Sequence, residues 1–518
     1  MPFKDYSNTP ASNTEIGGDL FIGPNMARND VRPALQQLAA DGRDLYDEVI
    51  ARSGTSTPSF VAAGTGARTR LLQDRGREVI HVTDYVIGDG VADDTAKYRQ
   101  AITAAVGKEL YYPAGITIRL TEQVLWLGET THRFGKGAKI TGAVNNYLIR
   151  PLGYPTLLAA TVSGAIARDA GVFTMSSAAG LAVGDDFYLY DVTTQEYDIN
   201  VVRLIDGNTV YTKFPINYNF ATAADIRVYK LANACRNVKV YGGRFENTFA
   251  GLGGHALGFL NATDCEVDGA TFADTGGVGL GLEISLRMIL RDVRTDNTGA
   301  VGVGCRNLKD FTFSNLQCRF PNADESLTFY KNCAFGVIET PNIEQYLFGQ
   351  APAGNDGTAG NNILLDERCC DITIINPRCR GSATYSIFIN NGSCRNRVIN
   401  ADIQYADLGG IRIALNSHDN EVMGGWVRNV IQAVDTEIAG NPATAAVQDD
   451  ATCTGNIFAT KNFSGNNGAT VAVRQLGTAG RHVMRGLPTY ADNTAALAGS
   501  LTAGMLYRTA AGAVQVVY

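Results

Sequence analysis

Residues 238–245 read Val-Lys-Val-Tyr-Gly-Gly-Arg-Phe, and similar short β-forming runs interrupted by Gly, Asn or Arg recur along the chain. Residues 372–379 read Ile-Thr-Ile-Ile-Asn-Pro-Arg-Cys, and residues 422–427 read Val-Met-Gly-Gly-Trp-Val. The interrupting residue lies at positions 242, 269, 291, 315, 376, 400 and 424. Repeats of about 20 to 30 residues built from short β-runs are typical of stacked solenoid coils. The sequence therefore predicts an all-β parallel β-helix, with two coils and an insertion in the long interval from 315 to 376.

The composition indicates many turns and argues against several partners. The 518 residues include 57 glycines and 15 prolines, and the formal net charge is −7. An acidic chain has no basic surplus to neutralise phosphates, so a nucleic-acid partner is not expected. The N-terminus lacks an apolar signal-peptide core, and the apolar run at 157–167 is too short to span a bilayer. We therefore expect neither secretion nor membrane insertion.

The cysteines and histidines do not form a metal-binding pattern. The chain has 10 cysteines and 5 histidines; Cys369 and Cys370 are adjacent, and no Cys-x-x-Cys spacing occurs. In a chain without an export signal, these cysteines are expected to be reduced thiols rather than a disulfide framework. We expect no metal site and no other cofactor.

Changes in composition predict four segments. Residues 1–52 contain one amphipathic helix with little core of its own, and residues 53–78 form a linker that begins with a Gly-rich stretch. Residues 79–450 form the β-helix, in which 137–232 are expected to be early coils plus a β-rich insertion. Residues 451–518 are rich in Gly, Ala and Thr and end in two short strands, as expected of a β-rich cap or tip module.

A distinct motif opens the β-helix segment. Residues 84–95 contain Asp-Tyr, Gly-Asp-Gly and Asp-Asp-Thr, a helix is predicted over 96–106, and residues 112–115 read Tyr-Pro-Ala-Gly. The Asp-Asp-Thr cluster is expected to cap the helix rather than to bind a metal. Together with residues 64–79, this region resembles the start of the pectate-lyase-like right-handed β-helix of bacteriophage tailspikes and tail fibres. The first fifty residues similarly resemble the virion-anchoring segment of such fibres, and the two matches cover about 115 residues.

The resemblance implies a function and partners. A tailspike of this kind is a homotrimer in the virion tail, assembled in the host cytoplasm. Residues 1–52 would be an α-helical anchor that attaches to a phage tail or baseplate protein. The β-helix would bind a host surface polysaccharide, either a capsule or an O-antigen.

Candidate chemistry comes from carboxylates, because the sequence has no nucleophile elbow, P-loop, zinc-protease or dinucleotide motif. Glycoside hydrolysis needs two carboxyl groups flanking the scissile bond, and neighbouring β-helix coils, about 4.8 Å apart, can supply them. The candidate catalytic residues end β-runs and flank the insertion in the long interval: Glu283, Glu339, Asp366 and Glu367. The candidate substrate-binding residues are a second carboxylate series and two tyrosines: Glu246, Asp274, Asp296, Tyr330 and Tyr346.

Other interpretations remain open at this stage. Each carboxylate could be a solvated turn residue, and the chain could be a receptor-binding fibre without catalysis. A polysaccharide lyase or epimerase would need a base and charge neutralisation, for which His255, Arg287 and Lys331 are available. Trp426 could stack on a sugar or pack in the protein. Residues 341–362 are expected to leave the coil as a long loop, a common place for ligand contact.

Overall fold

The computed structural model describes residues 79–321, 325–345, 360–406, 409–428, 453–460, 489–501, 506–511 and 514–517, and outside these ranges the short strands β1 to β4, β40, β42 and β43. The predicted helix of the first fifty residues, the tip of the 341–362 loop and Tyr346 lie outside the described residues. The chain divides into two compact units, Met1–Val79 and Ile80–Tyr518. The first contains two antiparallel pairs: β1 (Glu15–Ile16) with β2 (Leu20–Phe21), and β3 (Ser59–Val61) with β4 (Thr69–Leu71).

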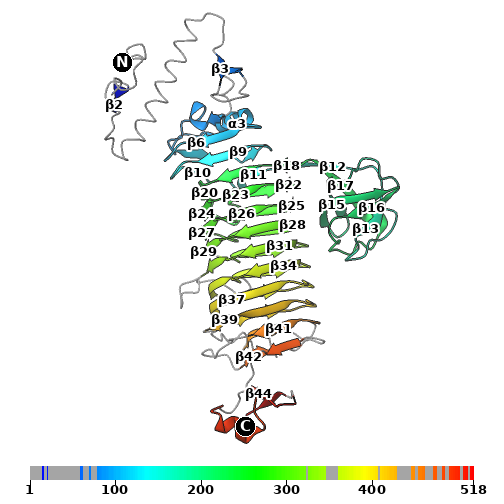
Figure 1. Cartoon of the computed structure of the whole chain (residues 1–518). Coiled ribbons are helices and arrows are strands. Elements are labelled where there is room, and N and C mark those ends of the chain that lie inside the picture. Colours follow the sequence, from blue (N-terminus) through cyan, green and yellow to red (C-terminus); the bar gives the residue numbers. More distant parts are fainter. Residues whose placement is uncertain are drawn as a thin grey trace, which may run out of the picture. The chain divides into compact units, whose positions relative to one another are not determined.

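The second unit contains a parallel β-helix whose coils run through three sheets in the order A, B, C (Figure 1). Sheet A consists of β6 (Glu109–Tyr112), β9 (Thr131–Phe134), β19 (Lys239–Tyr241), β23 (Glu266–Asp268), β26 (Ile289–Arg291), β31 (Ala334–Glu339), β34 (Cys370–Ile375), β41 (Ile457–Thr460) and β43 (Arg481–Met484). Sheet B consists of β7 (Thr117–Leu120), β10 (Lys139–Gly142), β20 (Arg244–Asn247), β24 (Thr271–Thr275), β27 (Arg294–Thr298), β29 (Gln317–Arg319), β32 (Asn342–Glu344) and β35 (Arg378–Ser382).

Sheet C consists of β8 (Val124–Trp126), β11 (Tyr147–Pro151), β21 (His255–Leu260), β25 (Leu280–Leu286), β30 (Leu327–Tyr330), β33 (Ile363–Asp366), β36 (Tyr385–Ile389), β38 (Gly409–Ile413), β40 (Ala445–Asp449) and β42 (Val471–Arg474). Three longer strands pass through a corner and join two sheets: β28 (Val303–Ser314) from C to A, and β37 (Arg397–Ala406) and β39 (Glu421–Arg428) from A to B. The short strands β18 (Cys235–Arg236) and β22 (Ala262–Thr263) lie between sheets C and A. The predicted all-β parallel β-helix is confirmed.

Equivalent inward side chains stack from coil to coil and form the core. Val240 pairs in register with Val267, which pairs with Leu290, and all three are fully buried. Burying such an aliphatic side chain stabilises a fold by about 1.5 to 3 kcal/mol. Because a strand alternates inward and outward positions, the same coils expose a regular row of outward side chains.

The repeating marker of the sequence is the residue at which the chain turns from sheet A to sheet B. These residues have φ between 49° and 73°: Gly242, Gly269, Asp292, Asn315, Thr340, Asn376, Asn400 and Gly424. Gly, Asn and Asp adopt this left-handed conformation at the lowest cost, which explains why they recur there. The marker predicted at 291 is wrong by one residue, since Arg291 ends β26 and Asp292 makes the turn. Thr340 marks the additional coil in the interval from 315 to 376.

Buried asparagines connect the later coils at the corner between sheets C and A. Asn396 donates to the Asn420 side-chain oxygen at 3.0 Å, and Asn420 donates to that of Asn456 at 3.1 Å. All three side chains are fully buried. Such a ladder satisfies polar groups that would otherwise be costly inside the coil.

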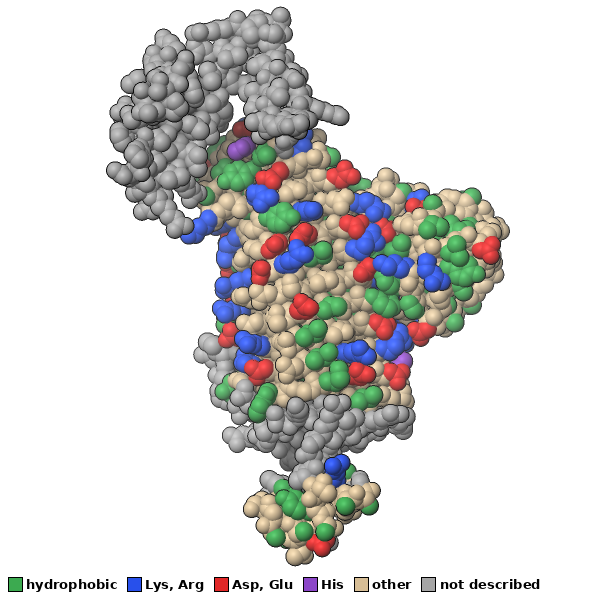
Figure 2. Space-filling model, viewed as in Figure 1, with side chains coloured by type: hydrophobic (Ala, Val, Ile, Leu, Met, Phe, Trp, Pro, Cys, Tyr) green, Lys and Arg blue, Asp and Glu red, His purple; other side chains and the backbone are tan. Residues whose placement is uncertain are grey.

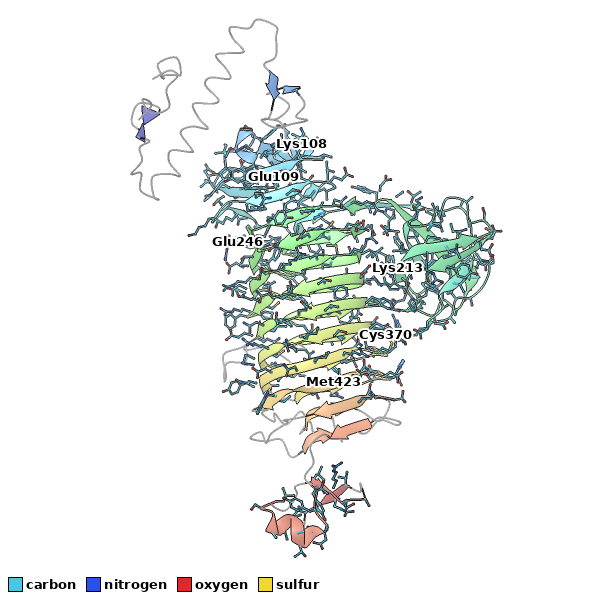
Figure 3. All side chains as sticks on the ribbon, in the orientation of Figure 1. Lys108, Glu109, Lys213, Glu246, Cys370 and Met423 are labelled. Atoms are coloured by element: carbon cyan, nitrogen blue, oxygen red, sulfur yellow. A yellow bond between two sulfur atoms is a disulfide. The ribbon has the colours of Figure 1, made fainter. Side chains whose placement is uncertain are left out.

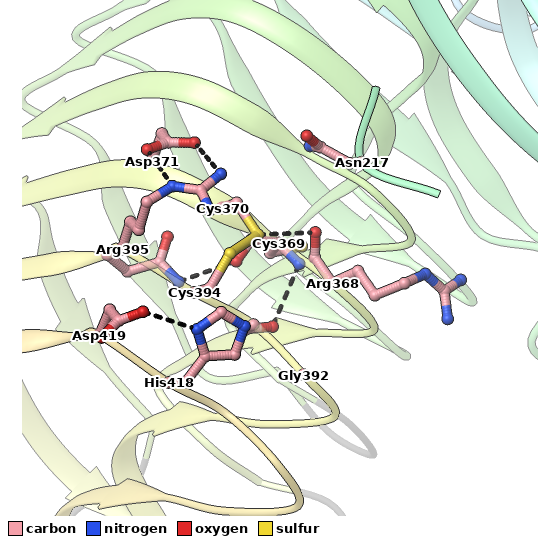
Figure 4. Close-up of a disulfide and its surroundings, with 12 residues drawn as sticks. Asn217, Arg368, Cys369, Cys370, Asp371, Gly392, Cys394, Arg395, His418 and Asp419 are labelled. Carbon is pink, nitrogen blue, oxygen red and sulfur yellow. Dashed lines mark hydrogen bonds and ion pairs between the residues drawn. A yellow bond between two sulfur atoms is a disulfide. The ribbon is translucent and has the colours of Figure 1, made fainter. Parts of the chain in front are cut away.

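The cysteines line the same stacked interior. Eight are buried free thiols: Cys235, Cys265, Cys305, Cys318, Cys333, Cys369, Cys379 and Cys453. Burial raises the pKa of Cys265 and Cys369, which keeps these thiols protonated and unreactive. The prediction of ten reduced thiols is wrong for one pair, because the register brings Cys370 and Cys394 of successive coils to a Cα separation of 4.6 Å, where they form a disulfide (Figure 4).

The first coil is covered by β5 (Val79–His81), the 3₁₀ turn η3 (Val82–Asp84) and helix α3 (Thr95–Ala104) (Figure 1). Asp93 precedes the N-cap residue, Asp94, and its carboxylate accepts the amide of Thr95, the first residue of the helix, at 3.0 Å. Asp94 has a different role from the predicted one. Its carboxylate is buried and accepts the amides of Ile87 and Gly88, so it fixes the preceding loop instead.

An insertion leaves the coil after β11 and returns at β18. It contains β12 (Tyr154–Leu157), β13 (Val172–Thr174), β14 (Asp186–Asp191), β15 (Glu196–Asp206), β16 (Thr209–Thr212), η4 (Ala223–Asp225) and β17 (Ile226–Asn233). The strands form one antiparallel sheet with its own apolar core. It docks on the corner between sheets C and A, where Arg287 makes a bidentate ion pair with Asp186 at 2.8 to 2.9 Å.

The C-terminal residues form a small module. Helix α4 (Asn493–Ala498) begins at Asp492, whose side chain accepts the Ala495 amide at 2.8 Å. Strands β44 (Leu506–Arg508) and β45 (Val514–Val516) pair antiparallel, as predicted for the two short terminal strands. Within the described part of the chain, no helix combines the length and apolarity needed to cross a bilayer.

Candidate active site on sheet C

Five outward side chains form one row on sheet C. Leu260 pairs with Glu283, Glu283 with Arg306, Arg306 with Tyr330, and Tyr330 with Asp366, each on the next coil. We call this the sheet C row. It contains three of the residues predicted from sequence, Glu283, Tyr330 and Asp366, and an exposed arginine that was not predicted.

The insertion forms a wall over the first half of the sheet C row. A cleft of about 400 Å³ lies between them, lined by Tyr188, Gln195, Tyr197, Leu260, Asn261, Glu283, Ile284, Arg306 and Asn307. Tyr188 comes from β14 and Tyr197 from β15. The cleft combines aromatic surface, three amide side chains and one charge of each sign, which suits a polar ligand with apolar ring faces.

Glu283 lies against a tyrosine that fills a space left by glycines. Tyr147 covers Gly258 and Gly281, since a Cβ on either would lie 2.4 Å or less from the tyrosine side chain. Burial and the neighbouring Glu283 carboxylate raise the pKa of Tyr147, so the phenol stays protonated. Arg150 lies 3.7 Å from Glu283 and stacks over the Tyr147 ring, and thereby balances the Glu283 charge.

The far end of the row carries two adjacent carboxylates beside Tyr330. Asp366 ends β33, and Glu367 follows it with φ of 48°. The Tyr330 hydroxyl donates to Glu367 Oε1 at 2.5 Å, and Asp366 Oδ1 accepts a hydrogen bond from Asn391 at 2.8 Å. Burial raises the pKa of Asp366, and the Glu367 carboxylate adds to that shift. The surroundings of Asp366 therefore favour its neutral form more than water does.

Two cations lie near the second carboxylate, Glu367. Lys331 and Arg368 each lie 3.8 Å from Glu367. The same two cations lie 3.0 Å from Glu196, a buried carboxylate on β15 of the insertion. The insertion thus helps to organise the charges around the Asp366–Glu367 pair.

The spacing along the sheet C row decides which of the candidate carboxylates could act together as the catalytic pair of a hydrolase. Glu283 and Asp366 are three coil steps apart, roughly 14 Å between backbones. The two carboxyl groups of a glycosidase lie about 5 to 9.5 Å apart, so Glu283 is too distant to work with Asp366 in one bond cleavage. Asp366 and Glu367 are chain neighbours, and the Glu367 carboxylate contributes to the raised pKa of Asp366, so they are the nearer candidate pair.

The remaining candidate residues lie on other faces. Glu339 ends β31 on sheet A, where it is exposed. The second carboxylate series lies on or next to the outer face of sheet B, where Figure 2 shows Lys and Arg side chains along the edge formed by β20, β24, β27 and β29, and where Figure 3 labels Glu246. Each of these carboxylates makes an ion pair there: Glu246 with Lys139 and Arg244, Asp274 with Arg244, and Asp296 with Arg294.

The side chains considered for a lyase have structural partners. Arg287 binds Asp186 and Asp264, and Lys331 binds Glu196. His255 Nδ1 accepts the Val278 amide at 2.8 Å, and burial lowers the pKa of this histidine. Within the described residues, no group of three or more His, Cys, Asp or Glu side chains is placed to hold a metal ion.

Sequence reasoning missed Arg306, Tyr147 and Tyr197 as parts of this site. The register of β28 brings Arg306 into the site, and the docking of the insertion brings Tyr197 there. Neither arrangement can be read from a local sequence pattern. A signal for Tyr147 did exist in the sequence. Gly258, Gly281 and Gly304 occupy one register position on three successive strands of a sheet, which leaves room for a large ring.

Comparison with known proteins gives matches at the level of structure. No protein-family model matches the sequence, and no curated protein does. The Gp54 tailspike of Acinetobacter baumannii bacteriophage AP22, solved in complex with A. baumannii capsular saccharide, has a TM-score of 0.53 at 13% identity, covering 84% of this chain and 74% of that one. The chain has the fold of a phage tailspike.

Two further solved structures show the same likeness. The tailspike gp61 of Pseudomonas phage phi297 has a TM-score of 0.50 at 13% identity, covering 80% of this chain and 74% of the tailspike. ORF18 of Geobacillus virus E2 has a TM-score of 0.50 at 11% identity, covering 79% and 69%. At these identities the similarity is one of fold, so the reaction must be argued from the residues of this chain.

Proposed function

We propose that the chain is the subunit of a phage tailspike that binds a bacterial surface polysaccharide and cleaves it by glycoside hydrolysis. The observation that carries the proposal is the Asp366–Glu367 pair beside Tyr330. One carboxyl group has a raised pKa and the other is surrounded by cations. A carboxyl group with a raised pKa next to a second carboxyl group is the equipment of acid-assisted glycoside cleavage.

In the proposed reaction, Asp366 gives its proton to the glycosidic oxygen as the bond from that oxygen to the anomeric carbon breaks. The Glu367 carboxylate stabilises the positive charge that develops on the sugar ring. It then removes a proton from the water that attacks the anomeric carbon, or bonds to that carbon to give a glycosyl-enzyme, which water hydrolyses as the Asp366 carboxylate takes the proton of that water. The products are two shorter chains, one with a new reducing end.

Binding along the sheet C row would orient the polysaccharide. Tyr330 offers its ring beside the carboxylate pair, and Tyr197 and Arg306 line the cleft two coils away. Among the described residues Arg306 makes no ion pair within 4 Å, so its charge is available to a ligand. This favours a polysaccharide with acidic sugars, whose carboxylates bind arginine well.

The assembly we propose follows the tailspike fold and the resemblance of the first residues. Three copies would form a homotrimer in the virion, with residues 1–52 attached to a tail or baseplate protein. The ligand would be a host capsule or O-antigen, as for the AP22 tailspike that was solved with a capsular saccharide. A phage component of this type would be assembled in the host cytoplasm.

The proposal is tested by incubating the full-length protein with polysaccharide from a bacterial strain to whose cells it binds. Reducing ends and the ultraviolet absorbance of unsaturated uronates are measured together. New reducing ends without absorbance are expected for hydrolysis. Both signals would identify a lyase instead, and binding with neither signal would identify a receptor-binding fibre without catalysis.

A further inference from the structure

A second groove lies at the corner between sheets A and B, a corner that sheet C does not adjoin. It has a volume of about 810 Å³ and lies in coils after the docking position of Arg287. Its lining residues are Asn315, Gln317, Thr340, Asn342, Asn376, Arg378, Asn400, Asp402 and Trp426. This corner groove holds none of the residues of the sheet C row.

The β-helix builds the floor of the corner groove from its turn residues. Asn315, Thr340, Asn376 and Asn400 are the left-handed turn residues of four successive coils. Asn400 donates to the Asn376 side-chain oxygen at 2.9 Å, so these amides form an exposed ladder. Because successive coils are about 4.8 Å apart, the floor presents a polar group at regular intervals along the axis.

The first outward residues of sheet B form the wall. Gln317 pairs with Asn342, Asn342 with Arg378, Arg378 with Asp402, and Asp402 with Trp426, each in register on the next coil. The wall therefore also repeats once per coil. It ends on a tryptophan that is 46% exposed.

The chemistry of the corner groove matches a chain of hydroxylated rings. Amide side chains both donate and accept, as sugar hydroxyls do, and they carry no charge. Most of the lining carries no charge: its ionisable side chains are Arg378 and Asp402, and Asp402 already pairs with Arg380 at 2.8 Å. An exposed indole at the end of a polar groove provides a flat apolar surface for the face of a sugar ring.

We propose that the corner groove is a second polysaccharide-binding site, separate from the cleavage site, which holds a neutral stretch of the chain in several successive coils. The inference rests on the proposed function for the identity of the ligand as a polysaccharide. It adds that attachment and cleavage use different faces of the subunit. A non-cleaving subunit would therefore still hold its polysaccharide through this groove.

The test uses the full-length Glu367→Gln variant, so that the probe is not consumed, and the polysaccharide of a strain to whose cells the protein binds. Trp426→Ala is expected to weaken binding about tenfold in this background, since loss of one stacked ring costs about 1.4 kcal/mol. Asn342→Tyr, which fills the groove without removing the tryptophan, is expected to weaken binding at least as much. Tyr154→Ala removes an aromatic side chain that is 58% exposed on the insertion, and it serves as the matched control.

The outcomes separate this inference from the proposed function. Unchanged affinity in both groove variants would overturn the proposal that the corner groove binds polysaccharide, whether or not Glu367→Gln has lost cleavage. Weaker binding in both groove variants, with cleavage retained by Glu367→Gln, would support the groove and overturn the proposed catalytic pair. If no strain yields a polysaccharide that the full-length protein binds, both are overturned.

Discussion

Lys309 Nζ lies 2.8 Å from Asp198 Oδ1, and both side chains are fully buried between the β-helix and the insertion. Lys309 also donates to the Pro215 carbonyl at 3.1 Å, and Asp198 accepts the Asn217 amide at 2.7 Å. Burial raises the pKa of Asp198 in spite of the lysine, which shows how strongly the site is desolvated. This ion pair holds the insertion, which forms the wall of the cleft on sheet C, against the β-helix.

Removing one member of this pair should destabilise the docked insertion. Lys309→Met leaves a buried carboxylate without its cation, which typically costs about 3 to 5 kcal/mol. We expect a lower denaturation midpoint and faster protease cleavage within 154–233. Lys309→Met combined with Asp198→Leu should recover most of the loss. Equal instability of the single and double variants would show that the pair is not what holds the insertion.

Arg306 should control the affinity for acidic polysaccharides. Arg306→Ala removes the cation of the cleft and is expected to weaken binding of an acidic polysaccharide about tenfold, with less dependence of the affinity on salt. Arg99→Ala, which removes an exposed surface arginine paired with Glu122, is the matched control. Affinity measured between 50 and about 300 mM NaCl distinguishes the two. If Arg306→Ala binds as the wild type does at every salt concentration, the cleft does not bind an acidic sugar.

His132 should make the β-helix less stable in mild acid. Burial lowers the pKa of His132 from 6.5 to about 3, so below pH 6.5 the unfolded chain binds a proton that the folded chain excludes. Stability is therefore complete above pH 6.5 and falls with pH, by about 2 kcal/mol between pH 6.5 and 5. The difference between the denaturation midpoints at pH 7.5 and pH 5 should be smaller in His132→Phe than in the wild type. His418→Gln, which changes a half-buried histidine, should behave as the wild type, and identical pH dependence in both variants would contradict the assignment.

The buried asparagine ladder at the corner between sheets C and A should contribute more to the free energy of unfolding than the exposed ladder of Asn376 and Asn400. Asn420→Ala removes the oxygen that accepts one side-chain N–H and the backbone N–H of Asn396 inside the coil, at a cost of about 2 to 4 kcal/mol. Asn376→Gly also removes one ladder member, but that ladder is exposed and glycine keeps the left-handed turn, so a change below about 1 kcal/mol is expected. Equal losses in the two variants, measured by chemical denaturation, would contradict this account.

The fold could be predicted because each coil is determined by its own residues. The turn from sheet A to sheet B requires a left-handed residue, and Gly, Asn and Asp at about 24-residue intervals make that requirement visible in the sequence. The marker predicted at Arg291 lies one residue before the turn residue Asp292, and this difference does not change the number of coils.

The site was harder to predict because a run of β-forming residues does not reveal which sheet it joins. Glu339 and Asp366 both end such runs, yet Glu339 belongs to sheet A and Asp366 to sheet C. The contribution of the insertion depends on contacts such as Lys309 with Asp198, which are 111 residues apart in the chain. No local pattern encodes such a contact.

The most direct test of the central claim is the rate of reducing-end release by the full-length protein and by Asp366→Asn and Glu367→Gln, alongside the polysaccharide affinity of each. Loss of a general acid or of its partner carboxylate is expected to slow cleavage at least about 100-fold while binding is retained. Glu122→Gln, an exposed carboxylate near the first coil, should cleave at the wild-type rate. Wild-type cleavage by Glu367→Gln, or loss of cleavage in Glu339→Gln instead, would contradict the assignment of the reaction to the Asp366–Glu367 pair.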